Sequence, residues 1–200
     1  MIKADLLQGS VSVAPGERVL ITGPNGSGKS VIAQTLVGLI PSGGKVTIGD
    51  GSVRGAKGRR RVGYLPQGAA HYEYLTVREN VEFFAGLAGV PRRGRGKVVA
   101  DLLELVGLTR LGSLEASRLT PGQRQRLAIA RALAGDPPAL VLDDPLAGLD
   151  AEGRAELDHL LQELAQMGKA ILLLAGDPDG LAHDRRLYLI DGALREGGAA

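Results

Sequence analysis

An eight-residue motif near the N-terminus constrains this chain more than any other feature. It has the pattern G-x-x-x-x-G-K-[ST] and consists of Gly23, Pro24, Asn25, Gly26, Ser27, Gly28, Lys29 and Ser30. An apolar run at residues 18–22 precedes it and a helix-compatible run at residues 30–40 follows it. This strand–loop–helix context is typical of a phosphate-binding loop, whereas a chance glycine-rich turn would not require it. The motif therefore predicts binding of a nucleoside triphosphate.

The residue types in the motif explain how it would hold phosphate. Glycines without a Cβ atom can aim successive backbone N–H groups at one anion, and the following helix adds partial positive charge at its N-terminus. Lys29 is expected to reach the β- and γ-phosphates, while the Ser30 hydroxyl is expected to ligate Mg²⁺.

Composition excludes several other kinds of site. The 200-residue chain has no cysteine, which rules out disulfides, thiolate catalysis and cysteine-based metal sites. The apolar stretch at residues 170–176 is too short to span a bilayer. The N-terminus has no signal-peptide core, so we expect a soluble protein.

The charges are nearly balanced overall but are unevenly distributed. There are 24 basic and 22 acidic residues, and basic residues gather at residues 54–61 and 92–97. These runs are either two solvated loops or a surface that faces anionic lipid headgroups or a membrane partner. No aromatic side chain is interleaved with them, so we expect no nucleic-acid partner.

Strand-like and helical patterns alternate along the chain. The strand-like runs lie at residues 10–14, 18–22, 45–49, 61–65, 140–143, 170–175 and 186–190, and the helical patterns at 30–40, 76–88, 98–106, 121–134 and 151–167. This alternation predicts an α/β fold with a largely parallel sheet. We expect one domain over residues 1–200, with an α/β core at 1–69 and 136–200 and a helical subdomain at 70–135.

Two carboxylates end the buried-strand pattern at residues 139–143. A parallel strand beside the phosphate loop would deliver Asp143 to the metal, directly or through water, and Asp144 would lie near the attacking water. A capped turn is the alternative explanation for paired acids at a strand end.

Three further motifs resemble those of ABC-type ATPases and stand in the right order, and the resemblance extends over almost the whole chain. Residues 119–133 resemble the signature helix, residues 63–67 the glutamine loop, and residues 147–150 the D-loop. The resemblance implies a P-loop NTPase core with a mostly parallel sheet, an inserted helical subdomain and a small antiparallel β portion.

The resemblance also implies a function. The chain would be the ATP-binding subunit of a transporter, held at the inner face of the cell membrane by a permease on another chain. Two cassettes, identical or different, would pair head to tail, so that Thr120, Gly122 and Gln123 face the partner's γ-phosphate. Gln67 would reach the metal or the water and sense the permease. Residues 75–80 with Phe83 and Phe84 are closest to cassettes that serve exporters.

Several positions depart from the family pattern near the reacting phosphate. The family's usual catalytic Glu is Asp144, whose carboxylate is withdrawn by about one C–C bond, ~1.5 Å. Misplacement on that scale costs around a hundredfold in rate, unless an extra water bridges the gap. Gly176 stands where the family has a His, and Pro121 removes one N–H from the signature.

The region before the phosphate loop departs as well. No aromatic residue precedes Tyr64, so the usual adenine stack is missing, and the first strand is expected to be shortened or absent. We therefore expect poor base selectivity and slow hydrolysis. The alternatives are an ATP-binding regulatory or dimerisation module with little hydrolysis, or a soluble ATPase of the iron–sulfur assembly kind.

Overall fold

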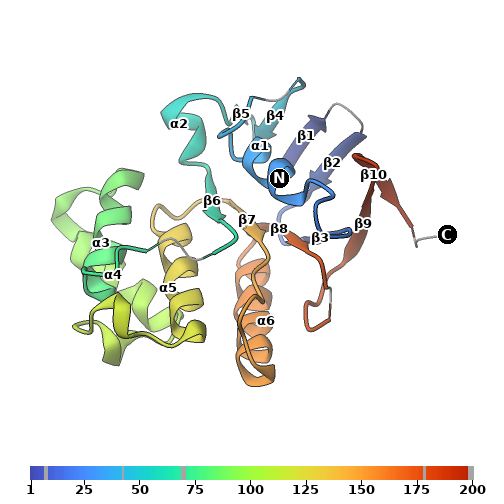
Figure 1. Ribbon diagram of the computed structural model, residues 1–200. Coiled ribbons are helices and arrows are strands. Elements are labelled where there is room, and N and C mark those ends of the chain that lie inside the picture. The colour runs from blue at the N-terminus through green and yellow to red at the C-terminus, as the bar shows by residue number, and fades with distance from the viewer. Residues whose placement is uncertain (7–8, 42, 69–70, 178, 198–200) are drawn as a thin grey trace.

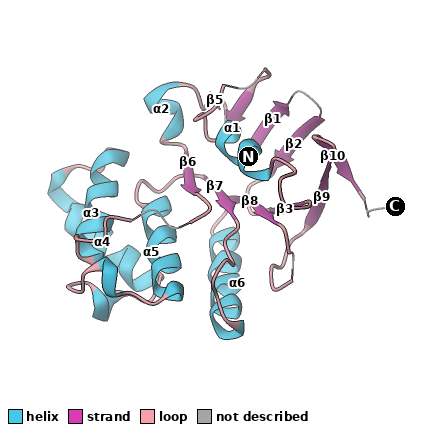
Figure 2. Cartoon of the chain, viewed as in Figure 1, coloured by secondary structure: helices cyan, strands magenta, loops and turns pink. Residues whose placement is uncertain are grey.

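The computed structural model describes residues 1–6, 9–41, 43–68, 71–177 and 179–197. It contains a six-stranded sheet in the order β10-β9-β3-β8-β7-β6 and a four-stranded sheet in the order β2-β1-β4-β5 (Figures 1 and 2). The strands are β1 (Ile2–Leu6), β2 (Gly9–Val13), β3 (Arg18–Thr22), β4 (Val46–Ile48), β5 (Gly51–Ser52), β6 (Val62–Leu65), β7 (Ala139–Asp143), β8 (Ala170–Ala175), β9 (Arg185–Ile190) and β10 (Ala193–Glu196). The α-helices are α1 (Lys29–Leu36), α2 (Gly55–Arg59), α3 (Val77–Ala88), α4 (Arg92–Leu105), α5 (Pro121–Leu133) and α6 (Ala151–Gln166).

The six-stranded sheet is parallel except for β10, which runs antiparallel to β9. Parallel strands bring their carboxyl ends to the same edge of a sheet, where ligands bind in open α/β folds. The loops that follow β3, β6, β7 and β8 therefore start from one edge. The α/β fold predicted from the sequence, with a mostly parallel sheet and a smaller antiparallel one, is confirmed.

Both faces of the parallel sheet are buried, because alternate side chains of each strand enter two different cores. Ile171 and Leu173 of β8 pack in the core that contains α5 and α6. Leu172 and Leu174 pack in the core that contains α1 and the antiparallel sheet. Figure 1 accordingly shows α1 and α6 on opposite sides of the sheet.

The first strand is present, contrary to the expectation from the sequence. In β1, Ile2 lies opposite Val13 of β2 and opposite Ile48 of β4, so β1 is the link between the two hairpins of this sheet. Ile2 and Ala4 are buried, while Lys3 between them is exposed. The alternating pattern is too short to stand out in the sequence, and β5, β10 and α2 went unrecognised for the same reason.

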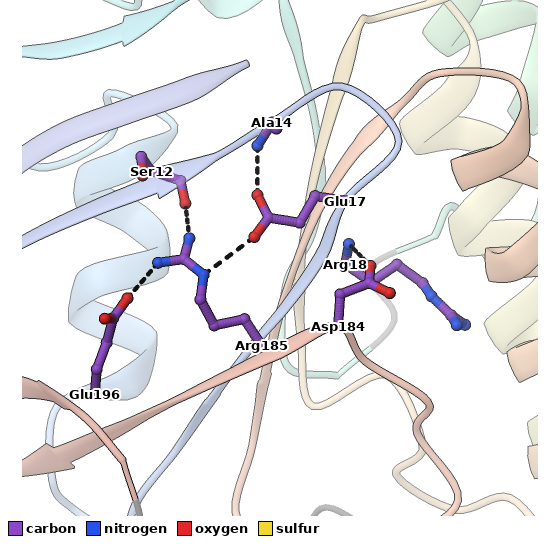
Figure 3. A network of polar contacts seen from close by, with 7 residues as sticks. All are labelled: Ser12, Ala14, Glu17, Arg18, Asp184, Arg185 and Glu196. Carbon is purple, nitrogen blue, oxygen red and sulfur yellow. Dashed lines mark hydrogen bonds and ion pairs between the residues drawn. The ribbon is translucent and has the colours of Figure 1, made fainter.

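A polar network centred on Arg185 joins the two sheets (Figure 3). Its guanidinium donates to Glu17 Oε1 across 3.1 Å, to Glu196 of β10 and to the carbonyl of Ser12 in β2. Glu17 also accepts from the backbone N–H of Ala14. These contacts fasten the outer strands of the parallel sheet to the antiparallel sheet.

The described part of the segment between β6 and β7 contains helices joined by loops, and its one β contact is an isolated bridge between Thr76 and Glu115. α3 begins with a capping box formed by Thr76 and Glu79, and α4 extends further toward the N-terminus than expected, with a kink at Arg93 and Gly94. The division into a core and a helical subdomain stays a prediction, and its boundary at residues 69 and 70 lies outside the described residues. Within the described ranges, no helix is long and apolar enough to cross a membrane.

Close packing at Gly63 supports the contact between α5 and β6. A methyl group on this residue would lie 2.3 Å from the Ala132 carbonyl oxygen and 2.6 Å from Leu140 Cδ2. We expect Gly63→Ala to lower the free energy of unfolding by about 1–3 kcal/mol, because the backbone of α5 cannot yield locally. The measurement is urea unfolding followed by circular dichroism.

Gly96→Ala is the matched control, since a methyl group there would enter open space within α4. It is expected to leave stability unchanged or to raise it by up to ~1 kcal/mol. Equal destabilisation by both substitutions would contradict the packing argument.

Candidate functional site

The phosphate loop lies between β3 and α1, as its motif predicts. Gly28 is the N-cap of α1 with φ of 99°, and Gly26 has φ of 80°, so both adopt the left-handed region that favours glycine. A methyl group on Gly23 would lie 2.8 Å from the Leu189 carbonyl oxygen, which leaves no room for a side chain. The loop thus exposes backbone N–H groups, rather than side chains, at the N-terminal end of α1, where the helix carries partial positive charge.

Lys29 folds back over this loop. Its Nζ donates hydrogen bonds to the carbonyls of Gly23, at 2.8 Å, and Pro24, at 3.0 Å. These bonds hold the ammonium group at the mouth of the loop, where it can meet an anion that the N–H groups bind.

Asp143 ends β7 and is 2% exposed. Burial raises the pKa of its carboxyl above the usual range, and Asp144 adds to the rise. Hydrogen bonds with Ser30 and the Gln67 backbone, together with the charge of Lys29, oppose it. Its Oδ2 atom is buried without a protein hydrogen-bond partner. An oxygen with unused acceptor capacity, beside the Ser30 hydroxyl and Gln67, fits a hard cation.

Mg²⁺ suits this donor set better than a metal that needs a protein cage. The described residues hold no group of three or more His, Cys, Asp or Glu side chains that could bind a metal. Mg²⁺ usually takes one or two carboxylates and completes its shell with water and substrate phosphates. Ser30, Asp143 and Gln67 could supply the protein share of such a shell.

Asp144 and Gln67 also meet. The Gln67 Nε2 atom lies 3.5 Å from Asp144 Oδ2. Asp144 has φ of 54°, and its backbone N–H donates to the Leu174 carbonyl across 2.7 Å, which fixes its direction at the end of the sheet. The structure therefore brings Ser30, Gln67, Asp143 and Asp144 to one cleft of about 930 Å³.

The loop after β8 adds two residues to this cleft, Gly176 and Asp177. A methyl group on Gly176 would lie 3.3 Å from Asn25 Oδ1, so this position adjoins the phosphate loop but carries no side chain. None of the three histidines lines the cleft: His183 bonds to the Leu181 carbonyl and His159 pairs with Glu163 on α6.

Sequence reasoning missed Asp177 and also Arg154, which supports it. Arg154 Nη1 lies 3.8 Å from Asp177 Oδ2, and its Nε donates to the Leu149 carbonyl in the expected D-loop. No local motif signals this pair, because its members are brought together only by the packing of α6 beside β8.

The expected signature residues lie elsewhere. Thr120 is the N-cap of α5, its hydroxyl accepts from the Gln123 N–H, and the Gln123 side chain accepts from the Thr120 N–H, with Pro121 at the first helical position. Thr120, Gly122 and Gln123 line a second cleft of about 530 Å³ with Gly148 and other residues near the expected D-loop. This cleft shares no lining residue with the phosphate-loop cleft.

A strand–loop–helix phosphate site, with a carboxylate at the end of a nearby parallel strand, defines the chain as a P-loop nucleoside triphosphatase domain. The family model described as "ABC transporter" matches residues 6–147. The chain belongs to the ABC transporter family and is an ABC-type ATPase domain.

Two curated relatives and one solved structure illustrate the similarity. The chain is 42% identical over 159 residues to a sulfate/thiosulfate import ATP-binding protein of Thermosynechococcus vestitus, covering 78% of this chain and 47% of the relative. It is 43% identical over 166 residues to Nod factor export ATP-binding protein I of Bradyrhizobium sp. (strain SNU001), covering 82% and 54%. The chain thus spans about half the length of these relatives.

The solved structure is a dimeric ATP-binding cassette in a post-hydrolysis state, bound to ADP and phosphate. It superimposes with a TM-score of 0.85 at 28% identity, and the match covers 98% of both chains.

The described lining of the phosphate-loop cleft contains no aromatic side chain. Without a stacked base, affinity would rest on the phosphates, so we expect ATP and GTP to bind within about threefold of each other. Stacking on an aromatic residue is worth roughly 1–3 kcal/mol per base. Competition between the two nucleotides for a fluorescent analogue measures this ratio, with Lys29→Ala as the non-binding control. A preference for ATP above tenfold would show that another group reads the base.

Proposed function

We propose that this chain is the ATP-binding subunit of a membrane transporter, working as a head-to-tail pair with a second cassette and hydrolysing ATP slowly. The observation that carries the proposal is the convergence of the phosphate loop, Asp143, Gln67 and Asp144 on one cleft, while the signature residues line another. A single chain with this arrangement holds the phosphates but cannot apply its own signature to them. A second cassette, identical or different, would complete each site.

The chemistry proposed for the cleft is transfer of the γ-phosphoryl group to water. The loop amides and Lys29 would bind the β- and γ-phosphates, and Ser30, Asp143 and Gln67 would hold Mg²⁺. Bound Mg²⁺ would supply positive charge against the phosphate oxygens. Asp144 and Gln67, already within 3.5 Å of each other, would orient the attacking water, whose oxygen forms a bond to phosphorus as the bond to the β-phosphate oxygen breaks.

Slow hydrolysis is proposed because the altered positions all concern the reacting end of the phosphate chain. Asp144 is one methylene shorter than Glu, Gly176 offers no imidazole, and Pro121 removes an N–H at the start of α5. This chain has altered residues both beside its own phosphate loop, at Asp144 and Gly176, and in its signature, at Pro121. A homodimer would therefore carry both kinds of alteration in each site. Pairing with an intact cassette would place one fault in each site.

Asp144→Glu tests the rate proposal. The longer side chain returns the carboxylate by about one C–C bond, and we expect kcat for Mg-ATP hydrolysis to rise by roughly ten- to a hundredfold with little change in KM. The measurement is phosphate release under single-turnover and steady-state conditions.

Asp101→Glu makes the same change on an exposed face of α4 and serves as the control. A wild-type rate that is already fast, and is not raised by Asp144→Glu, would overturn the slow-hydrolysis proposal. No hydrolysis by either protein would favour the regulatory module.

A groove of about 480 Å³ supports the proposal of a permease partner. It lies between α2 and β6 on one side and α3 and α5 on the other. Its lining includes exposed Leu87 and the partly buried Arg131, whose guanidinium carbon is 3.9 Å from the centre of the Phe84 ring. Burial lowers the pKa of Arg131 to about 10, and within the described chain no carboxylate forms an ion pair with it.

We propose that a cytoplasmic helix of the permease, with an apolar face and an acidic residue, occupies this groove. The cation–aromatic pair would gain a carboxylate, and the exposed rings of Tyr72 and Phe83 would be covered. Export is the proposed direction, supported only by residues 75–80 with Phe83 and Phe84. An iron–sulfur assembly ATPase is the alternative, and its partner would be a soluble protein.

Leu87→Asp should therefore release the permease. We expect co-purification of a co-expressed, tagged permease to fall at least tenfold, because a charge would be buried against the apolar face of the docked helix. Leu39→Asp, at a residue of similar exposure beyond α1, is the matched control. Retention of the permease by Leu87→Asp would exclude this groove as the docking site.

A further inference from the structure

Two segments of the chain carry basic residues and no acidic ones. Residues 51–72 and 83–100 together hold nine of the 24 basic residues and none of the 22 acidic residues. Fifteen basic and 22 acidic residues remain elsewhere, a net charge of −7. The near-neutral total therefore conceals a strong separation of charge.

The fold brings these two segments together at the C-terminal end of α3. A methyl group on Gly89, which ends α3, would lie 2.8 Å from Arg60 Nη1. Arg59 and Arg60 line the same groove as Leu87 and Ala88 of α3. Arg95 turns back to donate to the Val90 carbonyl across 3.1 Å, which holds the start of α4 against this point.

All but one of the cations of these segments are exposed, and none of them forms an ion pair with a described residue. We call the following set the basic rim: Arg54, Lys57, Arg59, Arg60, Arg92, Arg93 and Lys97, all of them exposed. The ion pairs found among the described residues join other residues: Arg18, Arg126, Arg154, His159, Lys169 and Arg185 supply the cations. Lys and Arg side chains are long, and those on a glycine-rich backbone can move to meet anions whose positions are not fixed.

We propose that the basic rim binds the anionic headgroups of phospholipids. Clustered Lys and Arg side chains near a membrane are attracted to its negative surface, and several acting together give stable binding. Residues 54–61 and 92–97, which hold the rim, contain no aromatic residue, whereas proteins bind single-stranded nucleic acid by stacking its bases on aromatic side chains.

This proposal rests on the proposed function for its location beside a membrane, but it is tested without the permease. The chain would be sedimented with vesicles of phosphatidylcholine alone, or with vesicles that also contain about 30% of the anionic lipid phosphatidylglycerol. We expect binding only to the anionic vesicles. At about 0.5 M salt the partition coefficient should fall at least about tenfold, because salt screens the attraction between the cations and the headgroups.

Two variants with equal changes in charge locate the effect. The rim variant avoids residues that line the groove and combines Arg54→Gln, Lys57→Gln, Arg92→Gln and Arg93→Gln. The control combines Lys3→Gln, Arg110→Gln, Arg118→Gln and Arg195→Gln, all at exposed positions outside the rim. We expect the rim variant to bind anionic vesicles about tenfold more weakly or worse, and the control to bind as the wild type does. Unchanged thermal unfolding shows that each variant is folded.

Outcomes of three kinds would overturn the proposal. One is equal binding to neutral vesicles, or none to anionic vesicles at low salt. Another is an equal loss in both variants, or duplex DNA that displaces the chain from vesicles at matched phosphate concentration. The last is a rim variant that no longer binds a co-expressed permease, together with a wild-type chain that does not bind vesicles. The cations would then bind the permease rather than lipid, and the proposed function would stand.

Discussion

The buried carboxylate of Asp143 is the constraint on which the nucleotide cleft depends. β7 lies between β6 and β8, and all five of its residues are buried. Its last residue, Asp143, is therefore held away from water. An unpaired buried charge is costly unless positive or hydrogen-bonding groups surround it. Lys29 and Ser30 at the start of α1 and the Gln67 backbone supply those groups. They come from the segments that follow β3 and β6 at the same edge of the sheet. The parallel sheet is thus what makes both the acid and its surroundings possible.

The parts of this site that the sequence predicted are those set by contiguous residues. The phosphate loop needs only a strand, a glycine-rich turn and a helix in succession, and an acid that ends an apolar strand is recognisable for the same reason. Asp177, Arg154 and the groove beside Arg131 could not be predicted, because each depends on how helices pack on the sheet. β1 was missed because two buried residues, Ile2 and Ala4, give too short a pattern.

The two basic segments illustrate the same limit. The sequence located both runs, at residues 54–61 and 92–97, but a solvated loop and a binding surface have the same composition. What separates these interpretations is spatial: Arg60 lies against Gly89, so two runs about thirty residues apart form one surface. The positions of the charges in the sequence do not predict that contact.

α5 connects the features on which the proposed function rests. Its first turn carries Thr120 and Gln123, and its last turn carries Arg131 in the groove. Between them, Gln125 is buried and its Nε2 donates to the Pro145 carbonyl across 2.6 Å, one residue beyond Asp144. Gly63, with no room for a methyl group, lets α5 lie directly on β6, the strand that leads to Gln67. A helix of thirteen residues is stiff over this length, so displacement of its groove end would move its signature end as well. The same displacement would strain the bond to Pro145, beside the carboxylate proposed to orient the water.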